Sequence, residues 1–168
     1  MTGTAVFAYM ESLYHFPHFY DLRIRAEIEA RKESDTGEVN LREIYNIIAR
    51  KTDIDIEIWM KREIEAEMLI CKPNPYFKQI VERLEKENKR IIAVSDMYLS
   101  TEAIEKLMKK CGYVKFEKIF ISNEYRCSKA KGGLYDVVRS YIPAETVLHI
   151  GDNISSDFSM AKKKGFEA

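Results

Sequence analysis

The 168-residue sequence has no excess of charge of either sign, because 27 lysines and arginines balance 27 aspartates and glutamates. A chain without a net field does not attract a phosphate backbone or an anionic membrane, so we expect neither nucleic acid nor a membrane as its main partner. No apolar run is long enough to span a bilayer. The first residues also lack the basic start and unbroken apolar block of a signal peptide.

Cysteine is scarce, and its positions are not those of a metal site or a disulfide framework. Cys71, Cys111 and Cys127 are odd in number and far apart in the sequence. This usage is typical of reduced thiols in a cytoplasmic protein. The glycine patterns of nucleotide-binding loops are missing too, since Gly132-Gly133 is too short for either common form. An unrelated nucleotide-binding domain is therefore disfavoured.

Hydrophobic residues are plentiful, at 46% of the chain, which is enough for a packed interior. The length fits one domain, or a core with a small insert. Apolar residues recur with a helical period through the first seventy or so positions, for example in NLREIYNIIAR, and no alternating strand pattern appears there. We therefore predict an all-helical unit over residues 1–72.

The pattern changes after Pro73, and the remaining residues, 73–168, predict an α/β unit. Asn74 and Pro75 are suited to begin a helix, and Gly112 is suited to end the one that Ser100 opens. Short apolar runs suited to buried parallel strands alternate with these helices, at residues 90–94, 117–122 and 146–150. Strict alternation of strand and helix predicts a three-layer parallel sheet with right-handed crossovers.

Polar residues follow each of the three predicted strands, where the chemistry of such sheets takes place. Ser95-Asp96 follows the first strand, Lys129 lies beyond the second, and Asp152 and Asp157 follow the third. A hydroxyl can hold a phosphate oxygen, a lysine can offset its charge, and carboxylates can bind Mg²⁺. The set therefore points to phosphoryl chemistry.

Three segments carrying these residues resemble the second, third and fourth motifs of the haloacid dehalogenase-like hydrolase superfamily: AVSDMYLS, SKAKGGLYDVV and LHIGDNISSDFSMAKKKG. They look most like a bacterial subgroup with an SDMYL second motif, whose members often accompany surface-polysaccharide genes. The resemblance implies a Rossmann-like core and a helical cap formed by the first half.

The resemblance also implies roles for individual residues. Ser95 would bind the phosphoryl oxygens with Asp96 beside it, and Lys129 would steady the nucleophile and the transferred group. Asp152 and Asp157 would hold Mg²⁺, the second directly or through water. The implied activity is magnesium-dependent hydrolysis of a small phosphorylated metabolite.

Structural roles compete with several of these assignments. Ser95 could be a turn residue, Asp157 could cap its helix, and Asp96 and Tyr98 could only shape their loop. Lys131 is an alternative to Lys129. The remaining conspicuous side chains are expected to be structural, either on the surface or in the core: His15, His18, Trp59 and His149.

The sequence departs from the family pattern at the nucleophile, which should be an aspartate at the end of a strand ahead of the cap. Asp53-Ile54-Asp55 imitates that motif, but it follows a polar stretch and should cap a helix. We expect either a piece of a longer protein, inactive for lack of this strand, or a non-catalytic relative that binds phosphorylated ligands or a partner protein in surface-polysaccharide synthesis. In both cases the exposed sheet edges would favour self-association.

Overall fold

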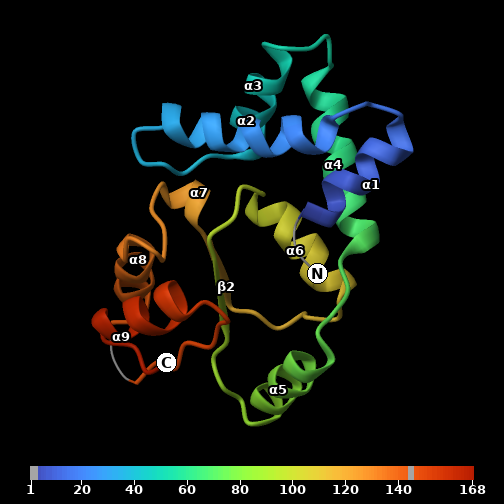
Figure 1. The fold of residues 1–168 in the computed structure, drawn as a ribbon. Helices are drawn as coiled ribbons and strands as arrows, with labels where there is room; N and C mark the ends of the chain where they lie inside the picture. The colour runs from blue at the N-terminus through green and yellow to red at the C-terminus, as the bar shows by residue number, and fades with distance from the viewer. Residues whose placement is uncertain (1–3, 144–145) are drawn as a thin grey trace.

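Four helices form the first part of the chain in the computed structural model, which describes residues 4–143 and 146–168. They are α1 (Thr4–Tyr14), α2 (Phe19–Glu33), α3 (Leu41–Ala49) and α4 (Ile56–Ile70). Helix α1 packs against α2 and α4, and α3 packs against the same two helices. Figure 1 shows this helical half at one end of the molecule. No helix of the described ranges is long and apolar enough to cross a membrane.

Local side-chain caps explain where two of these helices begin. Asn40 and Glu43 form a reciprocal capping box at the start of α3, which satisfies two backbone N–H groups. The Asp55 carboxylate accepts a hydrogen bond from the Ile58 N–H at 3.0 Å and so caps α4. The helix-capping interpretation of the Asp53–Asp55 stretch is therefore confirmed for Asp55.

The helical half has an apolar core that contains one buried ionic network. Trp59 lies in that core as expected, against the rings of Tyr14, Phe16 and Phe19. Arg23 is fully buried, and its guanidinium donates two hydrogen bonds of 2.8 Å to Glu63.

The Arg23 network extends to the other half of the chain. Its guanidinium lies between the rings of Phe7 and Tyr98, at 4.5 and 4.6 Å from their centroids. The Tyr45 hydroxyl donates to Glu63 at 2.7 Å. Tyr98 belongs to the loop after the first strand, so this residue of the SDMYL segment joins the two halves.

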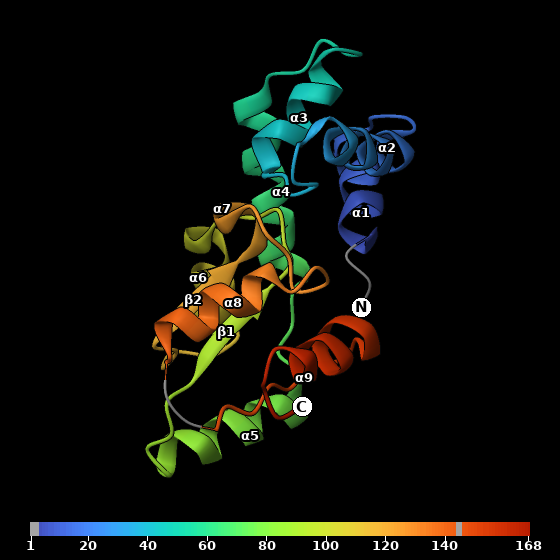
Figure 2. The ribbon, with the colours of Figure 1, turned by 90° about the vertical axis from the view of Figure 1, so that its left-hand side faces the viewer.

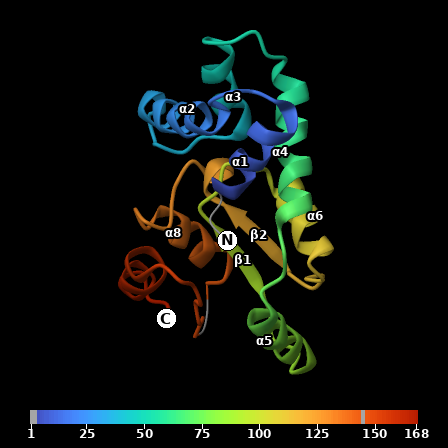
Figure 3. The same cartoon turned by 45° about the vertical axis from the view of Figure 1, so that its right-hand side comes forward.

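The second half is helix-rich with a small parallel sheet. Its elements are α5 (Pro75–Lys86), β1 (Ile92–Ser95), α6 (Thr101–Lys110), β2 (Lys118–Ile121), α7 (Ser122–Tyr125), α8 (Gly133–Tyr141), the π-helix η1 (Ile154–Met160) and α9 (Ala161–Lys163). Strands β1 and β2 pair in parallel, with Ile92 opposite Lys118 and Ser95 opposite Ile121. Helices α6 and α8 both contact β2 and lie on opposite sides of the strands in Figures 2 and 3.

Several boundaries in this half agree with the sequence. Asn74 caps α5, with Pro75 as its first residue. Ser100 caps α6, and Gly112 follows that helix with a left-handed φ of 82°. The predicted strands at 90–94 and 117–122 are observed at 92–95 and 118–121.

The third predicted strand, residues 146–150, is wrong as a member of this sheet. Only Leu148 pairs, and it pairs with Glu167 near the end of the chain. The His149 N–H donates to the Glu167 carbonyl at 2.7 Å, and the Glu167 N–H donates to the Val147 carbonyl at 2.9 Å. The apolar run finds its backbone partners there rather than along β1. Within the described ranges the sheet therefore has two strands instead of three.

The last predicted helix is present, but most of it is a π-helix and not an α-helix. Its first part, η1, is a π-helix, and only Ala161–Lys163 is α-helical before Gly165. The Asn153 side chain accepts hydrogen bonds from the Ser155 and Ser156 N–H groups and fixes the start of the wide turns. Turns of this kind often occur at functional sites.

Candidate functional site

The loop after β1 is fixed by residues at the end of β2. The Met97 N–H donates to the Ser122 hydroxyl at 3.1 Å. The Asn123 amide donates to the carbonyls of Met97 and Leu99, each at 2.7 Å. Ser122 and Asn123 are buried, and their polar side chains are hydrogen-bonded to the backbone of the loop after Ser95. Sequence reasoning assigned no role to these two residues.

Asp96 connects this loop to the loop that carries Lys129. Its carboxylate accepts a hydrogen bond of 2.8 Å from the Lys129 backbone N–H. Asp96 is otherwise exposed, and Ser95 at the end of β1 is half-buried. This contact matches the loop-shaping role considered for Asp96, and it brings the second and third sequence motifs together.

Lys129 and Asp157 form the centre of the site. The ammonium Nζ of Lys129 lies 2.5 Å from Oδ1 of Asp157, and the side chains are only 12% and 6% exposed. Oδ2 of Asp157 accepts from the Asn153 N–H at 3.1 Å. Burial opposes ionisation of Asp157, but the hydrogen bonds from Lys129, the Asn153 backbone and His149 outweigh it. The pKa of Asp157 is therefore below its ordinary value.

His149 is a member of this cluster that sequence reasoning missed. Its Nε2 lies 3.2 Å from Oδ1 of Asp157, and its ring stands edge-on against Tyr135 at 5.2 Å. Burial lowers the pKa of His149. The hydrogen bond to the Asp157 carboxylate opposes this effect, and the charge of nearby Lys129 adds to it. The apolar run 146–150 gave no signal for this contact, because Asp157 lies eight residues further along the chain, on the π-helix η1.

Asp152 is not part of the cluster. It is exposed, and the structure shows no hydrogen bond or ion pair from its carboxylate within the described ranges. Its neighbour Gly151 packs directly on Asp157: a side chain at Gly151 would overlap the Asp157 carboxylate. The Gly-Asp-Asn turn therefore wraps around Asp157 and presents Asp152 to solvent.

The two candidate lysines point to different partners. Whereas Lys129 pairs with Asp157, Lys131 is exposed and donates from Nζ to the Thr36 carbonyl at 2.7 Å. Of the two, Lys129 is the one joined to the motif carboxylates, and Lys131 contacts the segment between α2 and α3. The two lysines therefore differ in their partners, and the role of Lys129 stays a prediction.

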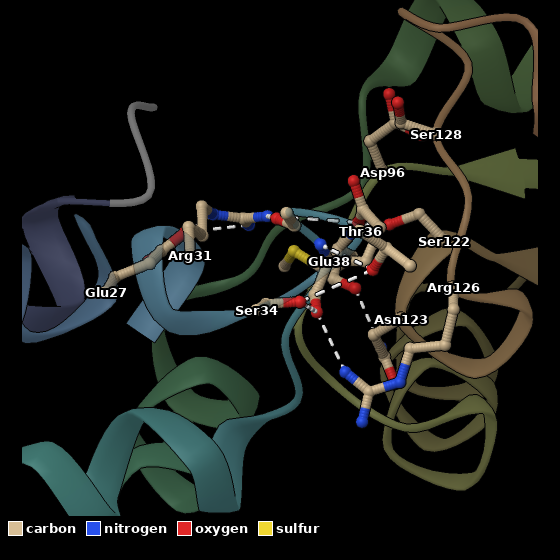
Figure 4. A network of polar contacts seen from close by, with 12 residues as sticks. Glu27, Arg31, Ser34, Thr36, Glu38, Asp96, Ser122, Asn123, Arg126 and Ser128 are labelled. Carbon is tan, nitrogen blue, oxygen red and sulfur yellow. Dashed lines mark hydrogen bonds and ion pairs between the residues drawn. The ribbon is translucent and has the colours of Figure 1, made fainter. Parts of the chain in front are cut away.

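The α2–α3 segment, residues 34–40, lies against the loops after β1 and β2. Arg126 donates to the Glu38 carbonyl at 2.8 Å and binds both oxygens of Glu43, at 2.7 and 2.9 Å. Figure 4 shows Ser34, Thr36 and Glu38 facing Asp96, Ser122 and Arg126 in one small region. The helical half thus reaches the carboxyl ends of the two strands, where the candidate site residues lie.

The carboxylates of this region do not form a metal-binding cluster by themselves. Nowhere in residues 4–143 and 146–168 do three His, Cys, Asp or Glu side chains gather closely enough to hold an ion. Both oxygens of Asp157 are taken by protein donors. What the arrangement provides is a buried ammonium group, paired with Asp157, beyond the carboxyl ends of the two strands, where parallel sheets bind their ligands.

Comparison with known families agrees with this architecture. A family model described as haloacid dehalogenase-like hydrolase matches residues 7–165. The chain therefore belongs to the haloacid dehalogenase-like hydrolases, which generally use Mg²⁺. No curated protein matches the chain significantly.

Proposed function

We propose that the second half of this chain binds the phosphoryl group of a small phosphorylated metabolite, with Lys129 as the main source of positive charge. The observation that carries the proposal is the buried Lys129–Asp157 pair, linked through the Lys129 N–H to Asp96 beside Ser95. An ammonium group already desolvated and oriented interacts strongly with an incoming dianion. Ser95 would add a hydroxyl at the end of β1.

In this proposal residues 1–72 act as a helical cap on a core formed by residues 73–168. The contacts from Arg126 and Lys131 to the carbonyls of Glu38 and Thr36 support it, because they join the α2–α3 segment to the loop that carries Lys129. A ligand with a phosphoryl group near Lys129 would meet residues 34–38 with its remaining part. Those residues would then contribute to selection among phosphorylated metabolites.

The residues present do not fit a complete magnesium site, so we derive no step through a metal ion. Asp157 is occupied by Lys129, His149 and Asn153, which leaves the exposed Asp152 as the carboxylate for Mg²⁺. One carboxylate gives weak binding. We expect calorimetry to show weak Mg²⁺ binding to the wild type and weaker binding to Asp152→Asn. Equal, tight binding by both proteins would contradict this.

Covalent phosphoryl transfer also needs a nucleophile in line with the phosphorus. The Asp96 carboxylate is engaged with the Lys129 N–H, and Asp157 is buried in its ion pair. We therefore propose that this chain binds a phosphoryl group without turning it over, and that a nucleophile-bearing strand belongs beside β1. The second candidate function is a non-catalytic binding or regulatory domain associated with surface-polysaccharide synthesis, and the engagement of both carboxylates supports the non-catalytic part of it.

The test of phosphate binding uses inorganic phosphate and two matched lysine variants. Lys129→Ala should abolish the binding that calorimetry or ³¹P line broadening detects. Lys131→Ala should retain it, because Lys131 contacts the Thr36 carbonyl instead. Equal binding by both variants would overturn the assignment of Lys129, provided that circular dichroism shows both to be folded.

The test of turnover is hydrolysis of a generic phosphate ester with Mg²⁺ present. The chain should stay at the background rate. Hydrolysis that Asp96→Asn abolishes would show that Asp96 is a nucleophile and would refute binding without turnover. The fusion of a strand with a terminal aspartate ahead of α1 should raise the rate above background if the catalytic interpretation is right, and should leave it unchanged if the domain is a binding module.

A further inference from the structure

Two of the three cysteines lie side by side although 40 positions separate them. Cys71 follows the last residue of α4 and begins the segment 71–74 that leads to α5. Cys111 follows the last residue of α6. Their sulfur atoms are 3.9 Å apart. Both thiols are free, Cys111 is 5% exposed, and Cys71 is half-buried and open to small reagents.

The backbone around the pair is held in place on both sides. Lys110 donates from Nζ to the carbonyls of Met68, Leu69 and Cys71, which neutralises the C-terminal end of α4. Beyond α6, the Tyr113 hydroxyl donates to the Asn74 carbonyl at 3.2 Å. The two sulfurs therefore meet between segments that are fixed to each other by hydrogen bonds before and after them.

We propose that Cys71 and Cys111 are a redox modification site, forming a reversible disulfide that ties the connection between the halves to the end of α6. A disulfide requires sulfurs about 2.05 Å apart. The sulfurs must approach by roughly 2 Å, a distance that rotations about the two Cα–Cβ bonds can supply when the backbones are already adjacent. Neither thiol belongs to the phosphate site, so this inference does not rest on the proposed function.

A small-molecule disulfide such as oxidised glutathione is the oxidant that balances the reaction. The Cys71 thiolate, the more accessible one, attacks one sulfur of the reagent and releases one glutathione thiolate. The Cys111 thiolate then attacks the Cys71 sulfur and releases the second. Two protein thiols are oxidised to one disulfide, and one glutathione disulfide is reduced to two thiols.

Burial and the neighbouring Cys111 raise the pKa of the Cys71 thiol. The fraction of thiolate at neutral pH is therefore small, and the exchange should be slow there and faster as the pH rises.

The bridge would act on the connection between the halves. Residues 71–74 are the covalent link from α4 to α5. A bond from Cys71 to α6 closes that link onto the second half and limits how far the helical half can tilt away from the loops after β1 and β2. Oxidation would thereby restrict the movement of the helical half relative to the second half.

The experiment is a titration of the full chain with mixtures of reduced and oxidised glutathione. Intact mass should fall by the mass of two hydrogen atoms. Iodoacetamide added after unfolding should then label one cysteine instead of three, with peptide mapping placing the label on Cys127. Cys127→Ser should give the same mass loss, whereas Cys71→Ser and Cys111→Ser should each prevent it. Exchange of the Cys71, Lys72 and Asn74 amides should slow on oxidation of the wild type and of Cys127→Ser.

Two outcomes would overturn the proposal. One is a stable glutathione adduct on Cys71 with Cys111 still open to alkylation after unfolding. The other is a bridge between chains or one that includes Cys127. Cys111→Ala serves as a second variant if Cys111→Ser does not fold, because alanine avoids burying a hydroxyl.

Discussion

Glu67 is the residue whose ionisation should be visible in the stability of the whole chain. It is 9% exposed, close to Glu63 and Arg23, and in hydrogen-bond contact with Tyr98. Burial and the Glu63 charge raise its pKa to about 7, against the opposing effects of Arg23 and Tyr98. The carboxyl is therefore neutral in the folded chain at a pH where it would ionise in the unfolded chain.

A folded-state pKa above the unfolded value gives stability that is complete at acid pH and is lost as the pH rises through about 7. We expect the free energy of unfolding in urea to fall between pH 5 and pH 8, with a contribution from Glu67 on the order of 2 kcal/mol after screening. Glu67→Gln should flatten this slope. Glu65→Gln, on the exposed face of α4, is the matched control and should leave the slope unchanged. An equal slope in the wild type and Glu67→Gln would contradict the prediction.

Gly151 offers a second test at the scale of single residues. Gly151→Ala should cost about 1–3 kcal/mol, because the new methyl group meets the Asp157 carboxylate. In an Asp157→Ala background the same change should cost less, with a coupling energy of about 1 kcal/mol or more. Urea unfolding of the four proteins in this cycle measures it. Additive effects would show that Gly151 and Asp157 do not press on each other.

The residue-level predictions from sequence succeeded where the signal was local. Asn74, Ser100 and Gly112 were predictable because a cap or a left-handed turn depends on a few neighbouring residues. His149 and the Cys71–Cys111 pair were not predictable, because each depends on a contact made by tertiary packing. The preference for Lys129 over Lys131 rested on motif resemblance and stays a prediction; in the structure Lys129 pairs with Asp157, and Lys131 contacts the Thr36 carbonyl.

At the scale of elements, β1 has one paired edge and one open edge. The Ile91 carbonyl accepts from the Glu117 N–H, so the odd-numbered residues of this strand turn their backbone groups toward β2. The N–H groups of Ile92 and Val94 must then point to the other side, where the structure shows no strand within the described ranges. All four residues of β1 are only half-buried.

Native-state hydrogen exchange by NMR should reveal this difference. The amides of Ile92 and Val94 should exchange at least about tenfold faster than the amide of Ala93, which faces β2. Ala93 is the internal control, since it lies between the other two on the same strand. Equal protection at low protein concentration would refute an open edge. Protection that grows with concentration would indicate self-association through β1.

The third strand and the final helix show where element prediction fails. The run 146–150 has the composition of a buried strand, but composition does not name the partner, and Leu148 pairs with Glu167. The helical pattern after Asn153 is real, but the period of apolar residues cannot separate an α-helix from a π-helix of seven residues. Strand β2 was predictable to within one residue at each end because helices α6 and α8 bury it on both sides.

At the scale of the whole molecule, polar side chains of the second half join the helical half at several places in the part of the chain that the structure describes, besides the packing of α4 on α6. Tyr98 inserts into the helical half beside Arg23. Arg126 and Lys131 bind the α2–α3 segment, and Lys110 binds the end of α4. The change of pattern after Pro73 predicts a division there, and that division stays a prediction; none of these contacts could be read from the sequence. Each joins residues far apart in the chain, and only the folded topology makes them neighbours.

The insertion of Tyr98 between the halves has a consequence for recombination. In a chimera whose helical half comes from a relative, the Tyr98 ring, two residues after Asp96, would enter the pocket of that relative. If that pocket lacked the Arg23–Glu63 pair, the ring would lose its cationic partner, and the loop after β1 would keep only its contacts with Ser122 and Asn123. Functional chimeras should therefore be those in which positions 23, 63 and 98 are inherited as a set.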